Sequence, residues 1–277
     1  LDGVDKPTMN RYCRYIVLSH GRTGSTIVTR MLRGHSCVVD YQELFNVNFQ
    51  AEFRCVTDRA TSLRYWLDTF DHAKAPRRPP LTALGSASVE TLLDKHVWHD
   101  GYAPSVRAVG FKLLHDQMQP SGRFPSLREE VERRLPQLRA VVITRRNLLK
   151  QYLSHVMADR VKQWHIPDAS CRLPRPRVHL EARQLMGAFE HSRRVEKEFA
   201  ALAADAESVM HIRYEELVER MSAHWRDLQD FVRAPHEAMP ELRLAKIENR
   251  TLGQAIANYD ELKRHFRGSP WEEFFDE

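Results

Sequence analysis

The residues best suited to chemistry form a short polar loop near the start of the chain. The loop covers residues 19–26, with the sequence SHGRTGST, and it lies between an apolar segment and a helical pattern. A turn from a strand into a helix points backbone N–H groups at one place, and the helix dipole adds partial positive charge there. Arg22 adds a full charge, and the small residues let an anion approach closely. The loop predicts a phosphate or sulfate site, although its glycines alone would also fit an ordinary capped turn.

The spacing within this loop excludes three common motifs. A Walker A loop requires G-x-x-x-x-G-K-[ST], but Gly21 and Gly24 are three positions apart and no Lys follows them. The dinucleotide pattern G-x-G-x-x-G and the nucleophile pattern G-x-S-x-G are absent. What remains is a phosphate-type loop whose charged residue, Arg22, precedes the second glycine.

A second pair of residues lies where an apolar strand pattern passes into a helix. Arg146 ends the apolar run, and Ser154 follows eight positions later, a little over two helical turns. An arginine fork and a serine hydroxyl at that spacing could hold one phosphate together. An arginine at a strand end is common on surfaces, but finding both motifs in this order by chance is much less common.

The elements that would position these motifs alternate along the chain. Strands are predicted at residues 14–19, 37–40, 106–114, 139–144 and 209–213. Helices are predicted at residues 26–33, 51–70, 88–98, 126–135, 147–162, 179–204, 215–231 and 252–262. Gly34 is expected to cap the first helix. This alternation predicts an α/β fold with a parallel sheet of about five strands, covered by helices on both faces.

We expect one domain over residues 1–277. Residues 1–10 are expected to be disordered or foreign to the natural protein, and residues 164–178 and 236–277 to form loops and a tail over the site. No apolar run approaches the roughly 18 residues of a membrane span, so no integral membrane segment and a cytoplasmic location are predicted. A targeting segment removed before Leu1 stays open.

The composition fits an anionic ligand without identifying it. The net charge is +5, and 33 of the 42 basic residues are Arg, which contacts phosphate and sulfate bidentately. These residues are spread along the chain, which argues against a nucleic-acid partner. The cysteines have no C-x-x-C spacing, and the pair His96 and His99 has no third ligand nearby, so no metal site is predicted.

The two motifs together resemble those of a known enzyme family. The run from Arg22 through Thr23, Gly24 and Ser25 to Thr26 resembles the 5′-phosphosulfate loop of sulfotransferases that use 3′-phosphoadenosine 5′-phosphosulfate (PAPS). Arg146 and Ser154 resemble the 3′-phosphate motif of the same family. Residues 110–117 and 258–262 resemble segments of its bacterial branch, which includes the nodulation-factor sulfotransferases.

The resemblance implies a P-loop-like three-layer α/β/α fold and a metal-independent reaction. PAPS would donate the sulfuryl group and leave as 3′-phosphoadenosine 5′-phosphate (PAP). The acceptor would be a hydroxyl of a small molecule or glycan, with a carbohydrate or glycolipid favoured. The oligomeric state stays open.

The resemblance also implies roles for individual residues. Arg22 would stabilise charge on the leaving 5′-phosphate, since a guanidinium is a poor proton donor. Glu43, after the second strand, would be the base that takes the acceptor proton, with His115 as the alternative. Lys112 would help to position the sulfate. A basic C-terminal segment would close over the 3′-phosphate and adenine, through Lys246, Asn249 and Arg250.

Two other functions stay open at this point. A P-loop kinase or nucleotidase would act on ATP or adenylyl sulfate, but the Walker Lys is missing and the pair Arg146 and Ser154 would be unexplained. A non-enzymatic anion or nucleic-acid binder would show an affinity that falls steeply with salt, and it would leave Glu43 without a role.

Overall fold

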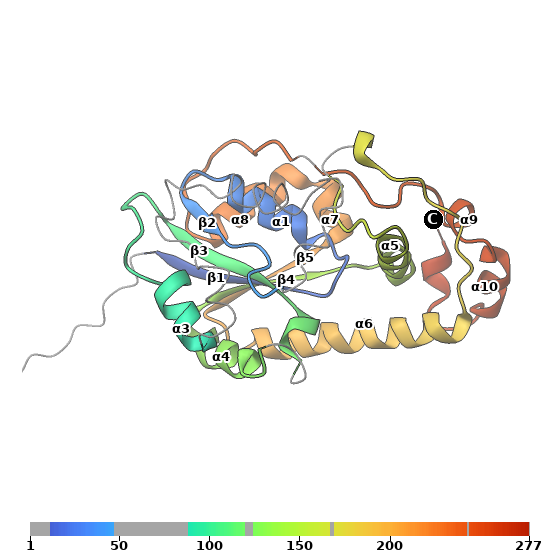
Figure 1. The fold of residues 1–277 in the computed structure, drawn as a ribbon, viewed down its shortest axis with the longest axis horizontal. Helices are drawn as coiled ribbons and strands as arrows, with labels where there is room; N and C mark the ends of the chain where they lie inside the picture. Colours follow the sequence, from blue (N-terminus) through green and yellow to red (C-terminus); the bar gives the residue numbers. More distant parts are fainter. Residues whose placement is uncertain (1–11, 47–87, 120–123, 167–168, 243, 277) are drawn as a thin grey trace, which may run out of the picture.

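The computed structural model describes residues 12–46, 88–119, 124–166, 169–242 and 244–276. The segment 1–10 and the predicted helix at 51–70 lie outside these residues. The centre of the fold is a five-stranded parallel sheet in the order β2-β3-β1-β4-β5 (Figure 1). Its strands are β1 (Cys13–Ser19), β2 (Val38–Asp40), β3 (Ala108–Leu114), β4 (Arg139–Thr144) and β5 (Ser208–Arg213). All five predicted strands are therefore present, and the α/β prediction is confirmed.

The helices follow the predicted order with several local differences. The α-helices are α1 (Ser25–Gly34), α3 (Val89–Leu92), α4 (Leu127–Arg134), α5 (Leu148–Val161), α6 (Ala182–Ala203), α7 (Tyr214–Glu219), α8 (Met221–Phe231), α9 (Leu252–Ala255) and α10 (Tyr259–His265). Shorter 3-10 turns are η4 (His115–Met118), η5 (Leu135–Gln137), η6 (Ala169–Cys171) and η7 (Glu272–Phe275), and η3 (Leu93–Val97) is a π-helical extension of α3.

The sheet is the middle of three layers because its strands bury both faces. Along β1, Ile16 and Leu18 pack into a cluster with α3, α4 and α6, while Tyr15 and Val17 pack into a second cluster with α1, α7 and α8. Figure 1 shows these helix groups below and above the sheet. Alternate side chains of a strand point to opposite faces, so a continuous apolar run suits this central position.

A third apolar cluster joins the C-terminal tail to α5 and α6. Phe189 of α6 contacts the rings of Phe266, Trp271 and Phe274 with centroid separations of 5.2–5.9 Å. The tail beyond α9 is thus anchored on the helices beside the site. Of the described residues of the tail, 244–252 line the cavity described below.

Three predicted boundaries were wrong for physical reasons. Gly34 does not cap α1 through a left-handed turn, because it is the last helical residue and His35 follows in an extended conformation. A side chain at position 34 would instead overlap Pro240, so close packing explains the glycine. The predicted helix 215–231 breaks at Arg220, and the predicted helix 252–262 is two short helices separated by residues 256–258.

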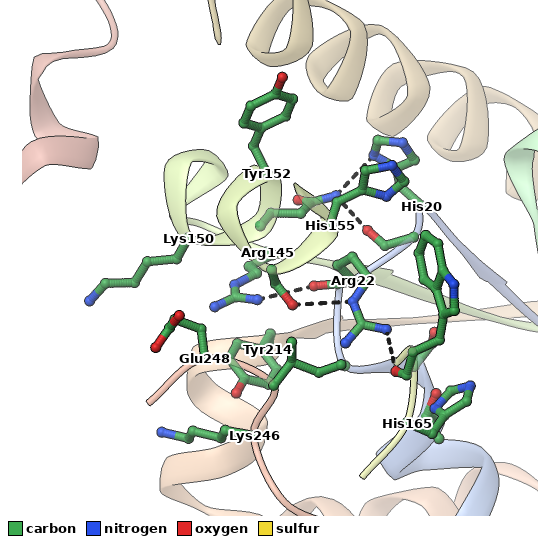
Figure 2. Close-up of a pocket in the computed structure, with 18 of the residues that line it drawn as sticks. His20, Arg22, Arg145, Lys150, Tyr152, His155, His165, Tyr214, Lys246 and Glu248 are labelled. Carbon is green, nitrogen blue, oxygen red and sulfur yellow. Dashed lines mark hydrogen bonds between the residues drawn. The ribbon is translucent and has the colours of Figure 1, made fainter. Parts of the chain in front are cut away.

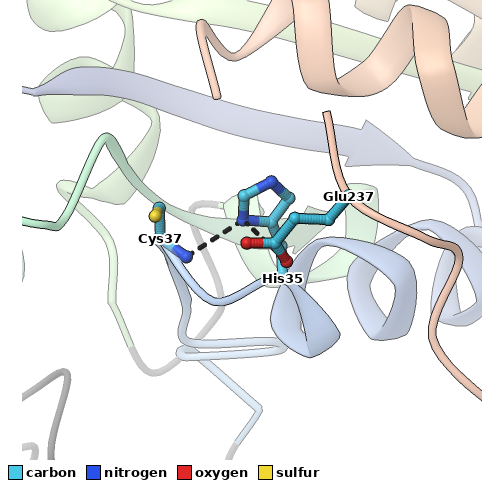
Figure 3. Close-up of side chains that lie close together, drawn as sticks. All are labelled: His35, Cys37 and Glu237. Carbon is cyan, nitrogen blue, oxygen red and sulfur yellow. Dashed lines mark hydrogen bonds and ion pairs between the residues drawn. The ribbon is translucent and has the colours of Figure 1, made fainter. Parts of the chain in front are cut away.

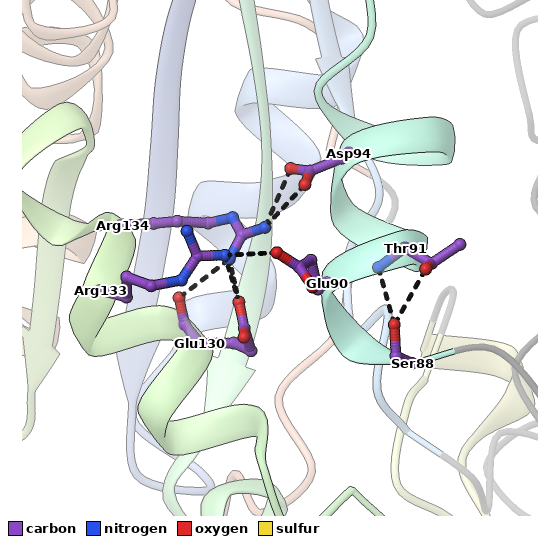
Figure 4. Close-up of polar contacts among 7 residues, drawn as sticks. All are labelled: Ser88, Glu90, Thr91, Asp94, Glu130, Arg133 and Arg134. Carbon is purple, nitrogen blue, oxygen red and sulfur yellow. Dashed lines mark hydrogen bonds and ion pairs between the residues drawn. The ribbon is translucent and has the colours of Figure 1, made fainter.

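An ion-pair network ties α4 to α3 on the lower layer (Figure 4). The buried Arg134 donates to both carboxylate oxygens of Asp94, at 2.9 and 3.0 Å, and also to Glu130. Arg133 joins Glu130 to Glu90. Each arginine here meets at least two carboxylates, and we call this group the α3–α4 network.

The topology determines where a ligand would bind. Strand β1 is central, with β3 on one side and β4 on the other, so the loops after β1 and β4 diverge at the same end of the sheet. In open parallel sheets ligands bind at the carboxyl ends of the strands, where such connections diverge. Among the described helices, none has the length and apolar character needed to cross a membrane.

Candidate functional site

A cavity of about 1730 Å³ lies at this end of the sheet. It is larger than the roughly 300–1,000 Å³ of typical small-ligand pockets, so two ligands can share it. Residues from both predicted motifs line it, together with Glu43, Lys112, His115 and residues 244–252. The structure therefore brings most of the predicted site residues to one place (Figure 2).

The phosphate loop has a tight left-handed geometry at two positions. Arg22 has a φ of 66° and Gly24, the N-cap of α1, a φ of 82°. A side chain at position 24 would overlap the ring of Tyr214, so this position requires glycine on two grounds. Gly24, Ser25 and Thr26 line the cavity. The hydroxyl of Thr23 instead donates to the carbonyl of His20, at 2.9 Å, and braces the loop from inside.

Arg22 links the two motifs directly. Its Nε donates to the Ser154 hydroxyl at 3.2 Å, and its Nη1 donates to the Trp164 carbonyl at 3.0 Å. Ser154 lies on α5 and is buried. Ser154 thus contacts Arg22 of the first loop, whereas the sequence predicted that it would hold a phosphate together with Arg146.

Arg145, which the sequence analysis overlooked, lines the cavity, while Arg146 does not. Arg145 donates to the Arg22 carbonyl at 3.1 Å, and its guanidinium lies 4.5 Å from the ring centre of Tyr214. Burial lowers the pKa of Arg145, and its Nε has no hydrogen-bond partner. Arg146 is 58% exposed in its side chain and lies 3.8 Å from Glu216. The structure therefore places Arg145 in the cavity, where the sequence predicted Arg146.

The outward direction of Arg146 follows from the cap of α5. The carboxylate of Glu215 accepts the backbone N–H groups of Arg146 and Asn147, at 2.9 and 3.2 Å, and the Asn147 side chain accepts the Lys150 N–H. Lys150 lines the cavity and was also missed. Its sequence signal was available, since Lys150 and Ser154 are four residues apart and share a helix face.

Lys112 connects the loop to the predicted base. Its ammonium forms an ion pair with Glu43 and lies 3.3 Å from the Thr26 hydroxyl. The other carboxylate oxygen of Glu43 accepts from Asn46 at 2.7 Å. Although burial opposes ionisation, the charge of Lys112 and these hydrogen bonds hold the pKa of Glu43 below its ordinary value. Glu43 is therefore an anion at neutral pH.

Histidines also line the cavity and form what we call the histidine wall. The rings of His20 and His115 contact His191 of α6, with centroids 5.3 and 5.7 Å away. His20 Nδ1 accepts from the Gln151 amide nitrogen at 2.9 Å, and His115 Nε2 lies 2.8 Å from Glu198. Burial, followed by the nearby histidines, lowers the pKa of His20 to about 4, so this ring is neutral at physiological pH.

The predicted site residues of the C-terminal segment differ in what their head groups contact. Lys246, Asn249 and Arg250 all line the cavity. The guanidinium of Arg250, however, pairs with Glu248 at 2.7 Å and donates to the carbonyls of Arg175 and Pro176. Arg250 thus fastens the C-terminal segment to the arginine-rich loop, and Lys246 is the cation of this segment with the freer head group (Figure 2).

Among the described residues, His35, Cys37 and Glu237 are the one group close enough to suggest a metal site (Figure 3). The Cys37 N–H donates to His35 Nδ1 at 3.0 Å, and His35 Nε2 lies 2.7 Å from the Pro235 carbonyl, to which it must donate. Both ring nitrogens are therefore already used, and a metal ion would have to displace one bond. The group instead holds residues 235–237 against the end of α1.

Comparison with known proteins agrees with this geometry. The sequence profile described as the Sulfotransferase family matches residues 15–238. Nodulation protein H of Rhizobium meliloti (strain 1021) is 26% identical over 272 residues, covering 95% of this chain and 94% of that protein. Nodulation protein H of Rhizobium tropici is 30% identical over 142 residues, covering 49% and 54%. A crystal structure of a sulfotransferase from Alicyclobacillus acidocaldarius aligns over 92% of this chain and 91% of that one, with a TM-score of 0.47 and 11% identity. The match of the profile to most of the chain shows that this protein belongs to the sulfotransferase family.

Proposed function

We propose that this sulfotransferase transfers a sulfuryl group from PAPS to a hydroxyl, most suitably one on a carbohydrate or glycolipid. The observation that carries the proposal is the hydrogen bond between Arg22 and Ser154, which joins the 5′ loop to the second motif inside one cavity. A donor with phosphates at both the 5′ and 3′ positions would need this combination.

The donor would lie across the basic side of the cavity. Its 5′-phosphosulfate would be held by the N–H groups and hydroxyls of Gly24, Ser25 and Thr26 and by Arg22, at the N-terminus of α1. The 3′-phosphate would contact Ser154 and Arg145. We assign this phosphate to Arg145 rather than Arg146 because Arg145 is the arginine that lines the cavity.

Sulfuryl transfer needs in-line positioning and charge stabilisation. Arg22 would stabilise the charge that grows on the departing 5′-phosphate, and Lys112 would contact the sulfate from its place beside Thr26. Glu43 is one candidate for the base, because its carboxylate is ionised and lies next to Lys112. His115 is the second candidate, and the contact that favours it is its bond to Glu198.

The remaining space would hold the acceptor. The histidine wall offers ring nitrogens that can hydrogen-bond to hydroxyls, and the cavity also has an apolar lining from Ile27, Phe45, Val218, Met221 and Leu244. Hydrogen-bonding imidazoles beside an apolar surface suit a sugar that carries a hydrophobic portion.

Calorimetric titration without metal tests the donor assignment. Wild-type protein should bind PAP at least tenfold more tightly than AMP, because only PAP carries the 3′-phosphate. Arg145→Ala should lose that preference, while Arg146→Ala, the matched change at the neighbouring position, should keep it. Equal affinity for PAP and AMP, or a preference for ATP with magnesium, would refute the proposal and support a nucleotide kinase.

A further inference from the structure

A carboxylate outside both motifs contacts a candidate base. Glu198 lies on α6, and its Oε2 is 2.8 Å from Nε2 of His115. His115 follows β3 directly, lines the cavity and is 8% exposed. The hydrogen bond from His115 lowers the pKa of Glu198, so this carboxylate is ionised at neutral pH.

The contact determines which ring nitrogen carries the proton. An ionised carboxylate only accepts hydrogen bonds, so Nε2 of His115 must be the N–H donor to Glu198. Nδ1 of the neutral ring then carries the lone pair. Its other neighbour is the Gln119 amide nitrogen, which lies 3.4 Å from both ring nitrogens and can donate a long hydrogen bond to Nδ1. The arrangement matches the carboxylate–imidazole half of a catalytic triad.

Glu43 differs in how its proton-accepting atoms are occupied. One of its oxygens is paired with Lys112 and the other accepts from Asn46. Each oxygen of Glu43 keeps a second lone pair, but the ion pair with Lys112 stabilises the carboxylate anion and so weakens it as a base. Among the described residues, Nδ1 of His115 faces no such cation and would give up only a long contact of 3.4 Å from Gln119.

We infer that Glu198 is a positioning residue that holds His115 in the Nε2–H tautomer, so that Nδ1 takes the proton of the acceptor hydroxyl. The inference rests on the proposed function. As the acceptor oxygen forms its bond to sulfur, the bond from sulfur to the 5′-phosphate oxygen breaks, and PAP leaves with that electron pair. The acceptor proton moves to Nδ1, and the resulting imidazolium is stabilised by the Glu198 carboxylate.

The surroundings of the pair are mixed in charge. Arg128 of α4 lies 3.9 Å from Glu198, and the ring of His191 lies beside His115. Asp116 follows His115 in the chain and interacts with its charge. A pH effect assigned to the pair must therefore be compared with a variant that leaves these groups in place.

The test compares Glu198→Gln with Glu190→Gln, a change of the same type at an exposed position two turns earlier on α6. Release of sulfate from PAPS is followed with water as the acceptor, since the natural acceptor is unidentified. Glu198→Gln should slow this release about 10- to 100-fold, less than the loss from removing a base outright, and should move the acid limb of the rate profile to lower pH. Glu198→Asp should restore part of the rate, and PAP affinity should stay within twofold throughout.

Nitrogen-15 NMR of histidine-labelled protein tests the tautomer without any turnover. Wild type should show His115 protonated at Nε2, identified by the signal lost in His115→Asn, and Glu198→Gln should show a mixture of tautomers. Wild-type-like rates and pH profile in Glu198→Gln, or an unchanged tautomer, would overturn the inference. Failure of wild type to bind PAP would refute the proposed function instead, and the NMR result would still decide the pairing.

Discussion

Two groups of buried arginines in this protein have opposite surroundings. In the α3–α4 network, Arg134 meets both oxygens of Asp94 and also Glu130, so its charge is balanced within the fold (Figure 4). In the cavity, Arg145 meets a carbonyl and the face of Tyr214, and its nearest carboxylate oxygen in an ion pair lies 4.0 Å away (Figure 2). Both side chains are largely buried, at 9% and 14% exposure.

The difference separates a structural arginine from a binding one. A buried charge is costly unless it is paired. The charge of Arg134 is neutralised by the carboxylates of Asp94 and Glu130, so a ligand anion would gain little from it. Arg145 is balanced mainly by dipoles and an aromatic ring, so an arriving phosphate would gain from it. Substitutions in the cavity should therefore change the affinity for the donor, and substitutions in the α3–α4 network should change the free energy of unfolding.

The largest effect on binding is expected from Gly24→Ala. The added methyl would overlap Tyr214, and the left-handed backbone at this position disfavours any side chain. Because Tyr214 also supports Arg145, the loop and the arginine should shift together. PAP affinity should fall at least 100-fold by calorimetry. Gly253→Ala, at a glycine of α9 with room for a methyl, is the control. A Gly24→Ala protein that binds PAP as wild type does would show that the loop is not the anion site.

Arg145→Ala should have the next largest effect. Loss of one charged phosphate contact is worth about 1.5–3 kcal/mol, so PAP affinity should drop about 10- to 100-fold, with little change in the midpoint of thermal unfolding. Arg146→Ala should change affinity less than threefold. A larger loss of PAP affinity in Arg146→Ala than in Arg145→Ala would mean that the exposed Arg146 turns inward when the donor binds. It would support the assignment of the 3′-phosphate to Arg146 that the sequence predicts.

The sequence predicted the sheet and both loops because each depends on local patterns. Apolar runs such as 14–19 and 139–144 define buried strands wherever they occur, and the loop after β1 needs only its own glycines and hydroxyls. The choice between Arg145 and Arg146 could not be predicted, since it depends on Glu215, 69 positions later, which caps α5 and turns Arg146 outward. The contact of Ser154 with Arg22 could not be predicted either, because it depends on how α5 packs beside the loop.

The pairing of His115 was out of reach for the same reason. Its partner Glu198 is on α6, 83 positions away, and no spacing links them. Gly34 is the opposite case, in which a local rule gave the wrong explanation. A glycine at the end of a helix often forms a left-handed cap, and the sequence predicted that role for Gly34. That glycine leaves room for Pro240 from a distant segment, and it is the last residue of the helix rather than a left-handed cap.

Arg134→Met should lower stability and leave binding unchanged. The variant removes the bonds to Asp94 and Glu130 but keeps an apolar stem, and the freed carboxylates can hydrate because Asp94 is 55% exposed. We expect the free energy of unfolding in urea to fall by about 2 kcal/mol. Arg128→Met, which removes an arginine with 42% side-chain exposure from the same helix, should cost less. A tenfold change in PAP affinity in Arg134→Met would break the distinction between the two groups.

The smallest effect concerns His20, at the start of the phosphate loop. Its pKa is lowered to about 4 by burial and by the neighbouring His191, His115 and His155, against about 6.5 in an unfolded chain. The folded state thus favours the neutral ring, and the stability that this gives is present above pH 6.5 and is lost as the pH falls toward 4. Between pH 7 and pH 5.5 the loss should be about 1 kcal/mol. His20→Asn can keep an acceptor for the Gln151 amide, so its unfolding free energy should fall less over the same interval. The other histidines are present in both proteins, so the difference between the two plots of unfolding free energy against pH reports on His20. Equal slopes in the two plots would mean that the His20 ring is hydrated rather than buried beside the phosphate loop.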